Sequence, residues 1–128
     1  MNEGITCLSV ALAHPDKALR PNGRAHWAVK QRAVRAARRT ARLLMLKSRR
    51  DAVAAGALPE GWKPVRYDVT WFFWGGTGPD SDNALASCKA YLDGCCDALG
   101  VNDRDLESAG IYRVKDREQA GTVLIRFY

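Results

Sequence analysis

The 128-residue sequence predicts an α+β protein with a small mixed sheet of about four strands and two main helices, in the order β-α-β-α-β-β. Short β-branched or alternating apolar runs predict the strands, and two longer stretches with helical periodicity separate the first three of them. Packing helices against such a sheet gives one core. Because a chain of this length can bury a core without disulfides, we expect a single domain over residues 1–128.

The first half of the chain predicts a strand, a loop and a long helix. Ile5–Leu12 is β-branched and apolar, and His14-Pro15 ends it. From residue 24 or 25 to about residue 55, apolar and small residues recur at spacings of three, four and seven, which is typical of a helix. The stripe expected to face the core contains Trp27, Val34, Ala37, Ala41, Leu44 and Ser48.

The remaining strands are expected over Val65–Phe73, Gly110–Val114 and Thr122–Tyr128, the last two separated by the polar turn 115–121. In the first of these, apolar residues alternate with polar ones, as they do in a strand. It ends in the aromatic run 71–74, and a dense aromatic strand predicts core rather than a base-stacking surface. Trp74, nearest the loop that follows, is the best candidate for an exception.

A second helix is expected over Asn83–Leu99, with Ser81 or Asp82 as its N-cap and Gly100 just past its end. Its apolar stripe would consist of Leu85, Cys88, Leu92, Cys96 and Leu99. Another face carries polar residues at spacings of three and four, which places Asp82, Lys89 and Asp93 on one side of the helix.

Charge is distributed very unevenly along the chain. The net charge is +6, but from residue 17 to residue 50 there is no Asp or Glu and there are twelve cations: Lys17, Arg20, Arg24, Lys30, Arg32, Arg35, Arg38, Arg39, Arg42, Lys47, Arg49 and Arg50. Such a surface repels itself until phosphates neutralise it, which favours contact with nucleic acid. Acidic residues predominate between Asp80 and Glu107, and that region would weaken phosphate binding unless a metal ion filled it.

Several function classes lack their motifs. The four cysteines form no C-x-x-C pair and have no zinc spacing to a histidine, so we expect buried free thiols in a reducing cytoplasm. The loop 75–78 lacks the Gly-Lys-Ser/Thr of a phosphate-binding P-loop, and the spacing after Asp80 does not match a calcium-binding EF-hand. No apolar run approaches the length of a membrane span, which predicts a cytoplasmic protein without membrane contact.

Asp80 and Asp82 follow a Gly/Pro loop, and Asp103-Arg104-Asp105 follows the second predicted helix. By itself Asp-x-Asp in a loop more often forms a turn or an N-cap. Separated carboxylates in a basic protein nevertheless indicate a metal site, because Mg²⁺ takes one or two protein carboxylates and completes its shell with waters and substrate phosphate.

The array Pro79-Asp80-Ser81-Asp82-Asn83, then Lys89, Asp93 and Asn102-Asp103, resembles the RusA family of phage-type Holliday junction resolvases. The resemblance covers nearly the whole chain, because the segment 19–24 and the basic helix after it are similar to the family's early Pro/Asn loop and its following helix. It implies metal ligands at Asp80, Asp82 and Asp103 and a catalytic lysine at Lys89. Asp105 remains a second candidate for the third ligand.

The resemblance also implies a homodimeric endonuclease that cuts two opposing strands of a four-way DNA junction with Mg²⁺, or with Mn²⁺ as its substitute. Its setting would be the cytoplasm of a bacterial host, as a phage or prophage-type protein. The residues expected to contact DNA are Arg20, Asn22, Arg24, His26, Lys30, Arg35, Arg38, Arg39 and Arg42. Gly94 could mark close helix packing, either at the dimer interface or within the chain.

Two alternatives stay open from the sequence. One is a basic nucleic-acid-binding protein without catalysis, and the other is a metal-dependent nuclease that acts on other branched DNA. The acidic residues favour phosphodiester hydrolysis, whereas junction selectivity depends almost wholly on the resemblance.

Overall fold

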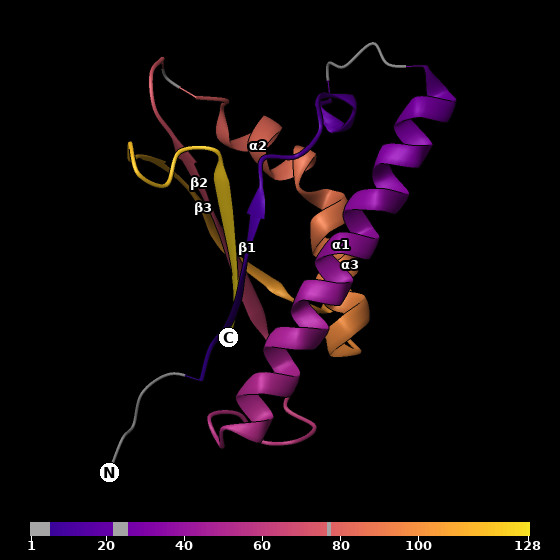
Figure 1. The fold of residues 1–128 in the computed structure, drawn as a ribbon, viewed down its shortest axis with the longest axis vertical. Coiled ribbons are helices and arrows are strands. Elements are labelled where there is room, and N and C mark those ends of the chain that lie inside the picture. Colours follow the sequence, from indigo (N-terminus) through magenta and orange to yellow (C-terminus); the bar gives the residue numbers. More distant parts are fainter. Residues whose placement is uncertain (1–5, 22–25, 77) are drawn as a thin grey trace.

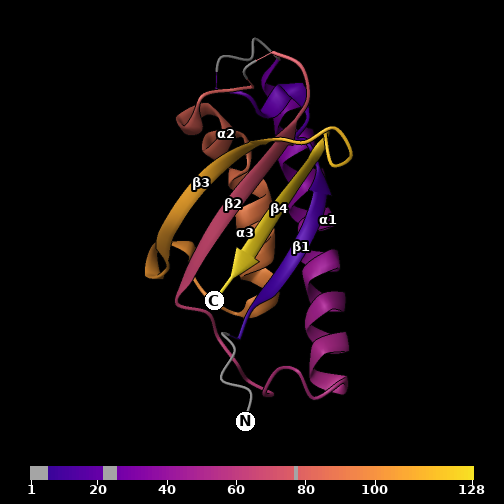
Figure 2. The ribbon, with the colours of Figure 1, turned by 90° about the vertical axis from the view of Figure 1, so that its left-hand side faces the viewer.

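A computed structural model describes residues 6–21, 26–76 and 78–128 as one sheet with helices on one of its faces (Figures 1 and 2). The strands are β1 (Leu8–Ala13), β2 (Arg66–Phe73), β3 (Glu107–Lys115) and β4 (Thr122–Phe127). The helices are α1 (Trp27–Ala54), α2 (Ser81–Ser87) and α3 (Lys89–Leu99), with short 3₁₀ turns η1 (Lys17–Leu19) and η2 (Asp103–Asp105). The predicted mixed α+β fold is confirmed.

The strand order is β1-β4-β2-β3, so the first and the last strand in the sequence are neighbours in the sheet. β4 pairs antiparallel with both β1 and β2, whereas β3 runs parallel to β2. A parallel pair needs a crossover connection, and α2 and α3 supply it. In the sequence, both α2 and α3 therefore lie between β2 and β3, and the segment that follows β2 leads to the start of α2.

The core lies between the sheet and the helices α1 and α3. Val69, Val123, Ile125 and Phe127 are fully buried on the sheet side of it. Asp68 on β2 is buried as well, because Arg126 opposite it on β4 donates two hydrogen bonds of 2.9 Å to its carboxylate. A central strand with large neighbours thus buries a polar residue that strand alternation alone would place in solvent.

Gly94 is where α1 and α3 approach each other most tightly. A Cβ added there would lie 2.1 Å from the carbonyl oxygen of Arg38 and 3.0 Å from the Cβ of Ala41. Only a residue without a side chain permits this crossing. The sequence left two possibilities for Gly94, close packing at a dimer interface or within the chain. The structure shows that Gly94 packs within the chain.

Three predictions about the helices are wrong. The stripe of α1 faces the core through Ala37, Ala41 and Met45, whereas Trp27 is 73% exposed because the first turn of α1 lies away from the sheet (Figure 1). Leu44 is also exposed, at the edge of the stripe beside Ala41 and Met45.

The second helix is interrupted at Cys88, which ends α2 and precedes α3. Its N-cap is Asp80 rather than Ser81 or Asp82, because the Asp80 carboxylate accepts a 2.8 Å hydrogen bond from the backbone nitrogen of Asn83. Gly100 ends α3 in the left-handed conformation, as predicted.

The thiols of Cys88, Cys95 and Cys96 are buried and free, as predicted, but Cys7 is exposed because it lies just before β1. Burial raises the pKa of Cys88 to about 12, so this thiol stays protonated. None of the helices in the described residues is long and apolar enough to cross a membrane.

Candidate active site and nucleic-acid surface

A groove of about 440 Å³ opens between the start of α2, the start of α3 and the turn η2. Its polar lining consists of Asp82, Lys89, Asp103 and the phenol of Tyr67. Leu85, Ala86 and Leu92 form its apolar wall. Three of the four residues predicted to be catalytic therefore share one open groove, although they come from segments separated by up to twenty residues.

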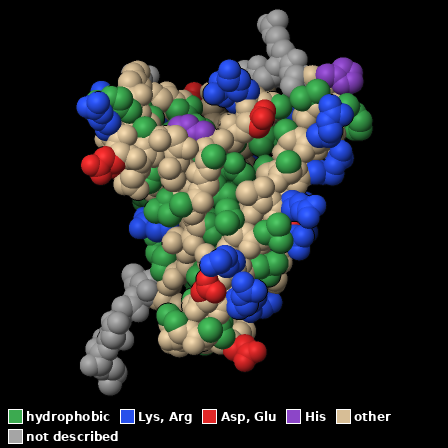
Figure 3. Space-filling model, viewed as in Figure 1, with side chains coloured by type: hydrophobic (Ala, Val, Ile, Leu, Met, Phe, Trp, Pro, Cys, Tyr) green, Lys and Arg blue, Asp and Glu red, His purple; other side chains and the backbone are tan. Residues whose placement is uncertain are grey.

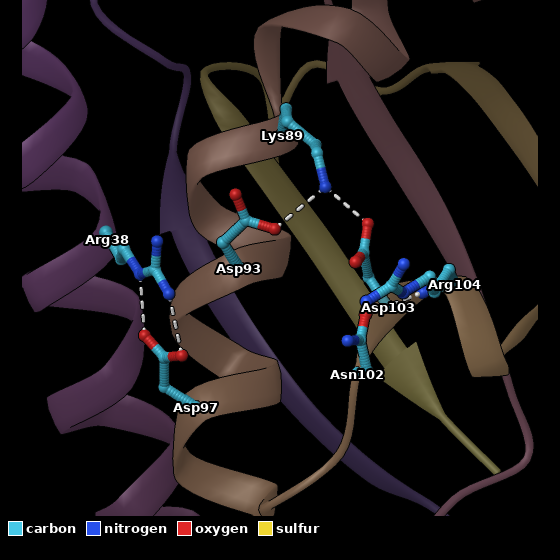
Figure 4. A network of polar contacts seen from close by, with 7 residues as sticks. All are labelled: Arg38, Lys89, Asp93, Asp97, Asn102, Asp103 and Arg104. Atoms are coloured by element: carbon cyan, nitrogen blue, oxygen red, sulfur yellow. Dashed lines mark hydrogen bonds and ion pairs between the residues drawn. The ribbon is translucent and has the colours of Figure 1, made fainter.

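Lys89 lies at the centre of this arrangement (Figure 4). Its Nζ is 2.8 Å from the carboxylate of Asp93, one turn further along α3, and it also contacts the carboxylate of Asp103 (Figure 4). An ammonium has three N–H donors, so one donor is left over from these two contacts for a ligand in the groove. The side chain is 56% exposed, which leaves that donor accessible.

The charges of this cluster support one another. Partial burial lowers the pKa of Lys89, but its hydrogen bonds to Asp103 and Asp93 outweigh burial and raise the pKa above its ordinary value. The hydrogen bond from Lys89 in turn lowers the pKa of Asp103. Lys89 is the first residue of α3, where the helix dipole disfavours a cation, and the two carboxylates offset that disadvantage.

Asp80 and Asp82 have different roles in the structure. The carboxylate of Asp80 caps α2 and also accepts a 3.3 Å hydrogen bond from the side-chain amide of Asn83. Asp82 lies in the first turn of α2, lines the groove and is exposed. Asp80 thus has a structural role that accounts for its presence, whereas the carboxylate of Asp82 faces the groove and has no hydrogen-bond or ion-pair partner among the residues that the structure describes.

Asp103 and Asp105 also differ in their positions relative to the groove. Asp103 contacts Lys89 and lines the groove, while Asp105 is exposed at the other end of η2 and does not line it. The structure therefore brings Asp103 rather than Asp105 to Lys89. Asn102, whose side chain accepts a 3.2 Å hydrogen bond from the backbone of Arg104, shapes this turn.

The carboxylates in the groove suit a hard divalent cation, but there are two of them where the sequence predicted three aspartate ligands. Among the described residues, no three His, Cys, Asp or Glu side chains lie close enough together to hold a metal ion. Asp82 and Asp103 along one groove still meet the minimum that Mg²⁺ takes from a protein, since phosphate oxygens and waters can complete the shell.

The basic residues expected to contact DNA follow α1, where Lys and Arg side chains line its outer edge (Figure 3). Three of these residues make no ion pair with any acid in the described part of the chain, namely Arg35, Arg39 and Arg42. Their charges are therefore available to a ligand. Lys30 lines a second groove of about 280 Å³ together with Lys89 and Asp93, which joins the start of α1 to the acidic groove.

The other residues that were predicted to contact DNA have different environments. Arg38 donates two hydrogen bonds, of 2.6 and 2.8 Å, to Asp97 on α3, so its guanidinium joins the two helices (Figure 4). His26 caps α1 by accepting from the backbone of Ala28, and it is exposed, as is Arg20. Asn22 and Arg24 lie outside the described residues.

Two features of the site were not predicted from the sequence. Tyr67 lines the groove from β2, where the sequence showed only strand alternation. Trp74 is 56% exposed and carries two cations near its ring, Lys115 at the end of β3 and Arg117 in the turn that follows. The exception expected at Trp74 within a buried aromatic run is confirmed, but the cations beside it had no signal in the sequence.

The fold and this groove define a small two-layer α+β protein with a charged site at the crossover between parallel strands. No family model matches the chain. It is 39% identical over 120 residues to an uncharacterized protein of Xylella fastidiosa, and this match covers 91% of the chain and 73% of that relative. The chain belongs to the same family as the Xylella fastidiosa protein.

Proposed function

We propose that the protein is a metal-dependent endodeoxyribonuclease that resolves four-way DNA junctions by paired strand cuts. The observation that carries this proposal is the groove in which Asp82, Asp103 and Lys89 meet beside a basic helix. The similarity of Pro79-Asp80-Ser81-Asp82-Asn83 to the RusA resolvases supports the choice of substrate.

Each residue has a role that its position permits. Asp82 and Asp103 would hold Mg²⁺ or Mn²⁺, with Asp80 close by in sequence as a further ligand. When bound, such an ion activates a water molecule and stabilises the charge that develops on the phosphate. Lys89 directs its remaining N–H donor at the phosphate, and its two carboxylate partners keep it protonated.

DNA would approach along α1, where Arg35, Arg39 and Arg42 bind backbone phosphates and give affinity without sequence preference. A homodimer suits this substrate, since a C₂ axis places two equivalent sites on symmetry-related strands of the junction. The setting we propose is the cytoplasm of a bacterial host, with the gene carried by a phage or prophage.

The test compares a synthetic four-way junction with a linear duplex of equal length, with and without Mg²⁺ or Mn²⁺. We expect symmetric nicks in the junction alone, and an approximately thousandfold slower reaction for Asp82→Asn, because the metal contributes several kcal/mol to the transition state. Asp51→Asn is the matched control, since Asp51 is an exposed acid that forms an ion pair with Lys47 on the outer part of α1 and does not line the groove.

Each alternative has its own outcome. Metal-dependent cutting of both DNAs would discard junction selectivity and keep a nuclease of broader substrate range. Tight binding with no cleavage at any metal concentration, and with Asp82→Asn unchanged, would favour the basic nucleic-acid-binding protein without catalysis.

A further inference from the structure

Trp74 is the exposed member of the aromatic run 71–74, whose other members are buried or partly buried. It directly follows β2, and 56% of its surface is exposed, whereas Trp71 and Phe72 before it are 7% and 8% exposed. Lys115 Nζ lies 5.4 Å from the centroid of its ring, and the guanidinium carbon of Arg117 lies 6.0 Å from it. A large apolar ring in solvent beside two cations is an unusual surface for a residue that only fills space.

A backbone hydrogen bond and a side-chain hydrogen bond join the chain beside Trp74 to the end of the sheet that carries the two cations. The nitrogen of Asp116, between Lys115 and Arg117, donates to the carbonyl of Phe73 at 2.9 Å. Arg113 on β3 donates to the carbonyl of Pro79 at 3.1 Å. Phe73, just before Trp74, and Pro79, just before Asp80, are thus each hydrogen-bonded to β3 or to the residue that follows it.

The two cations have no acid to neutralise them within the described residues. The nearest acid in sequence, Asp116, is occupied by its own turn, since its carboxylate accepts from the backbone nitrogen of Glu118 at 2.9 Å and from the side-chain amide of Gln119 at 3.0 Å. The ammonium and the guanidinium are therefore free to exchange the indole for an anion.

We propose that Trp74, Lys115 and Arg117 bind an unpaired nucleotide, with its base stacked on the indole and its flanking phosphates paired with the two cations. This inference rests on the proposed function, and it assigns to branched DNA a contact beyond the duplex arms. Nucleotides combine a π-face with an adjacent anion, which is the combination that this surface complements. Because Trp74 lies only eight positions before Asp82 in the sequence, the nucleotide would be held close to the groove.

The experiment titrates the whole protein with an oligothymidylate of about twelve nucleotides in metal-free buffer and follows tryptophan fluorescence and affinity. We expect the strand to quench the fluorescence. Trp74→Leu should remove much of that quenching and weaken binding about tenfold, while Trp74→Phe should keep most of the affinity because it keeps a stacking face. Lys115→Gln with Arg117→Gln should flatten the salt dependence of binding.

Trp27→Leu is the matched control, since Trp27 is even more exposed but lies on α1. Equal affinity and quenching in Trp74→Leu and Trp27→Leu would overturn this inference, and so would Trp74→Phe binding as weakly as Trp74→Leu. If those results came from a protein that still cut junctions, the proposed function would stand. A wild-type protein that bound neither the strand nor the junction would remove both, and would leave this surface to an acidic protein partner.

Discussion

The helix α3 meets two different environments along one row of residues. Toward its end it closes on α1, where Gly94 touches the backbone of Arg38 and Asp97 receives the guanidinium of that residue. At its start Lys89 and Asp93 face open grooves in solvent. The first region is close-packed, whereas the second brings together three charged side chains that are exposed or only partly buried.

This difference separates what the fold requires from what it merely supports. An added methyl group at Gly94 has no space, so the close approach of α1 and α3 depends on that residue. Exposed ion pairs, by contrast, contribute little to stability, and a protein would fold without the Lys89 cluster. Substitutions in the two regions should therefore divide cleanly between loss of stability and loss of activity.

Gly94→Ala is the most damaging substitution we predict for the fold. The new Cβ would lie 2.1 Å from the Arg38 carbonyl oxygen, so α1 must move. We expect the free energy of unfolding to fall by about 2 kcal/mol or more, even though Ala gains about 1 kcal/mol over Gly in a helix interior. Urea denaturation followed by circular dichroism measures this.

A glycine with open space around it provides the control for that prediction. At Gly56 no atom lies within 4 Å of an added Cβ, and φ is +74°, so Gly56→Ala should cost only backbone strain of about 1 kcal/mol. If Gly94→Ala were as stable as Gly56→Ala, the close crossing of the two helices would not be what limits stability.

Asp93→Asn should affect activity rather than stability. Asp93 holds Lys89 over the groove, so we expect cleavage to slow about tenfold through misplacement of the ammonium. Hydrogen bonds to Asp103 and Asp93 raise the pKa of Lys89, so removing one lowers it, and the alkaline limb of the pH–rate profile should move to lower pH. Rates of junction cleavage across the pH range measure both effects.

Asp93→Glu and Asp97→Asn complete this comparison. The longer carboxylate should restore much of the rate and move the alkaline limb back, while Asp97→Asn, one turn further along α3, should leave cleavage unchanged. An unshifted profile in Asp93→Asn, with wild-type rate, would mean that Lys89 needs no help from Asp93.

The sheet and the long helix could be predicted from the sequence because local periodicity determines them. The break at Cys88 could not, since the apolar stripe continues from Leu85 to Leu92 across it. The N-cap was misplaced by one or two residues because Asp80, Ser81 and Asp82 can all cap a helix, and only backbone geometry selects Asp80.

The site was predictable where it depends on spacing within a helix and not where it depends on tertiary contacts. Lys89 and Asp93 are four residues apart, so their pairing follows from helical geometry. The approach of Asp103 depends on the turn that Gly100 makes after α3, with φ of +69°, and on the path of η2. The pairing of Arg38 with Asp97 had no sequence signal, because fifty-nine positions separate the two residues.

The Arg38–Asp97 ion pair belongs to the stabilising region but should contribute least. The hydrogen bond from Arg38 lowers the pKa of Asp97 below its ordinary value near 4, so the pair stabilises the fold above that pH and its contribution is lost as the pH falls through the lowered pKa. Because both side chains are partly exposed, Asp97→Asn should cost about 1 kcal/mol or less at neutral pH and nothing at an acid pH below the lowered pKa of Asp97. Urea denaturation at the two pH values, beside Asp51→Asn for an ordinary i,i+4 pair on α1, measures the difference. A penalty that persisted at acid pH would show that Asp97 stabilises the crossing through packing rather than charge, and would move it to the same class as Gly94.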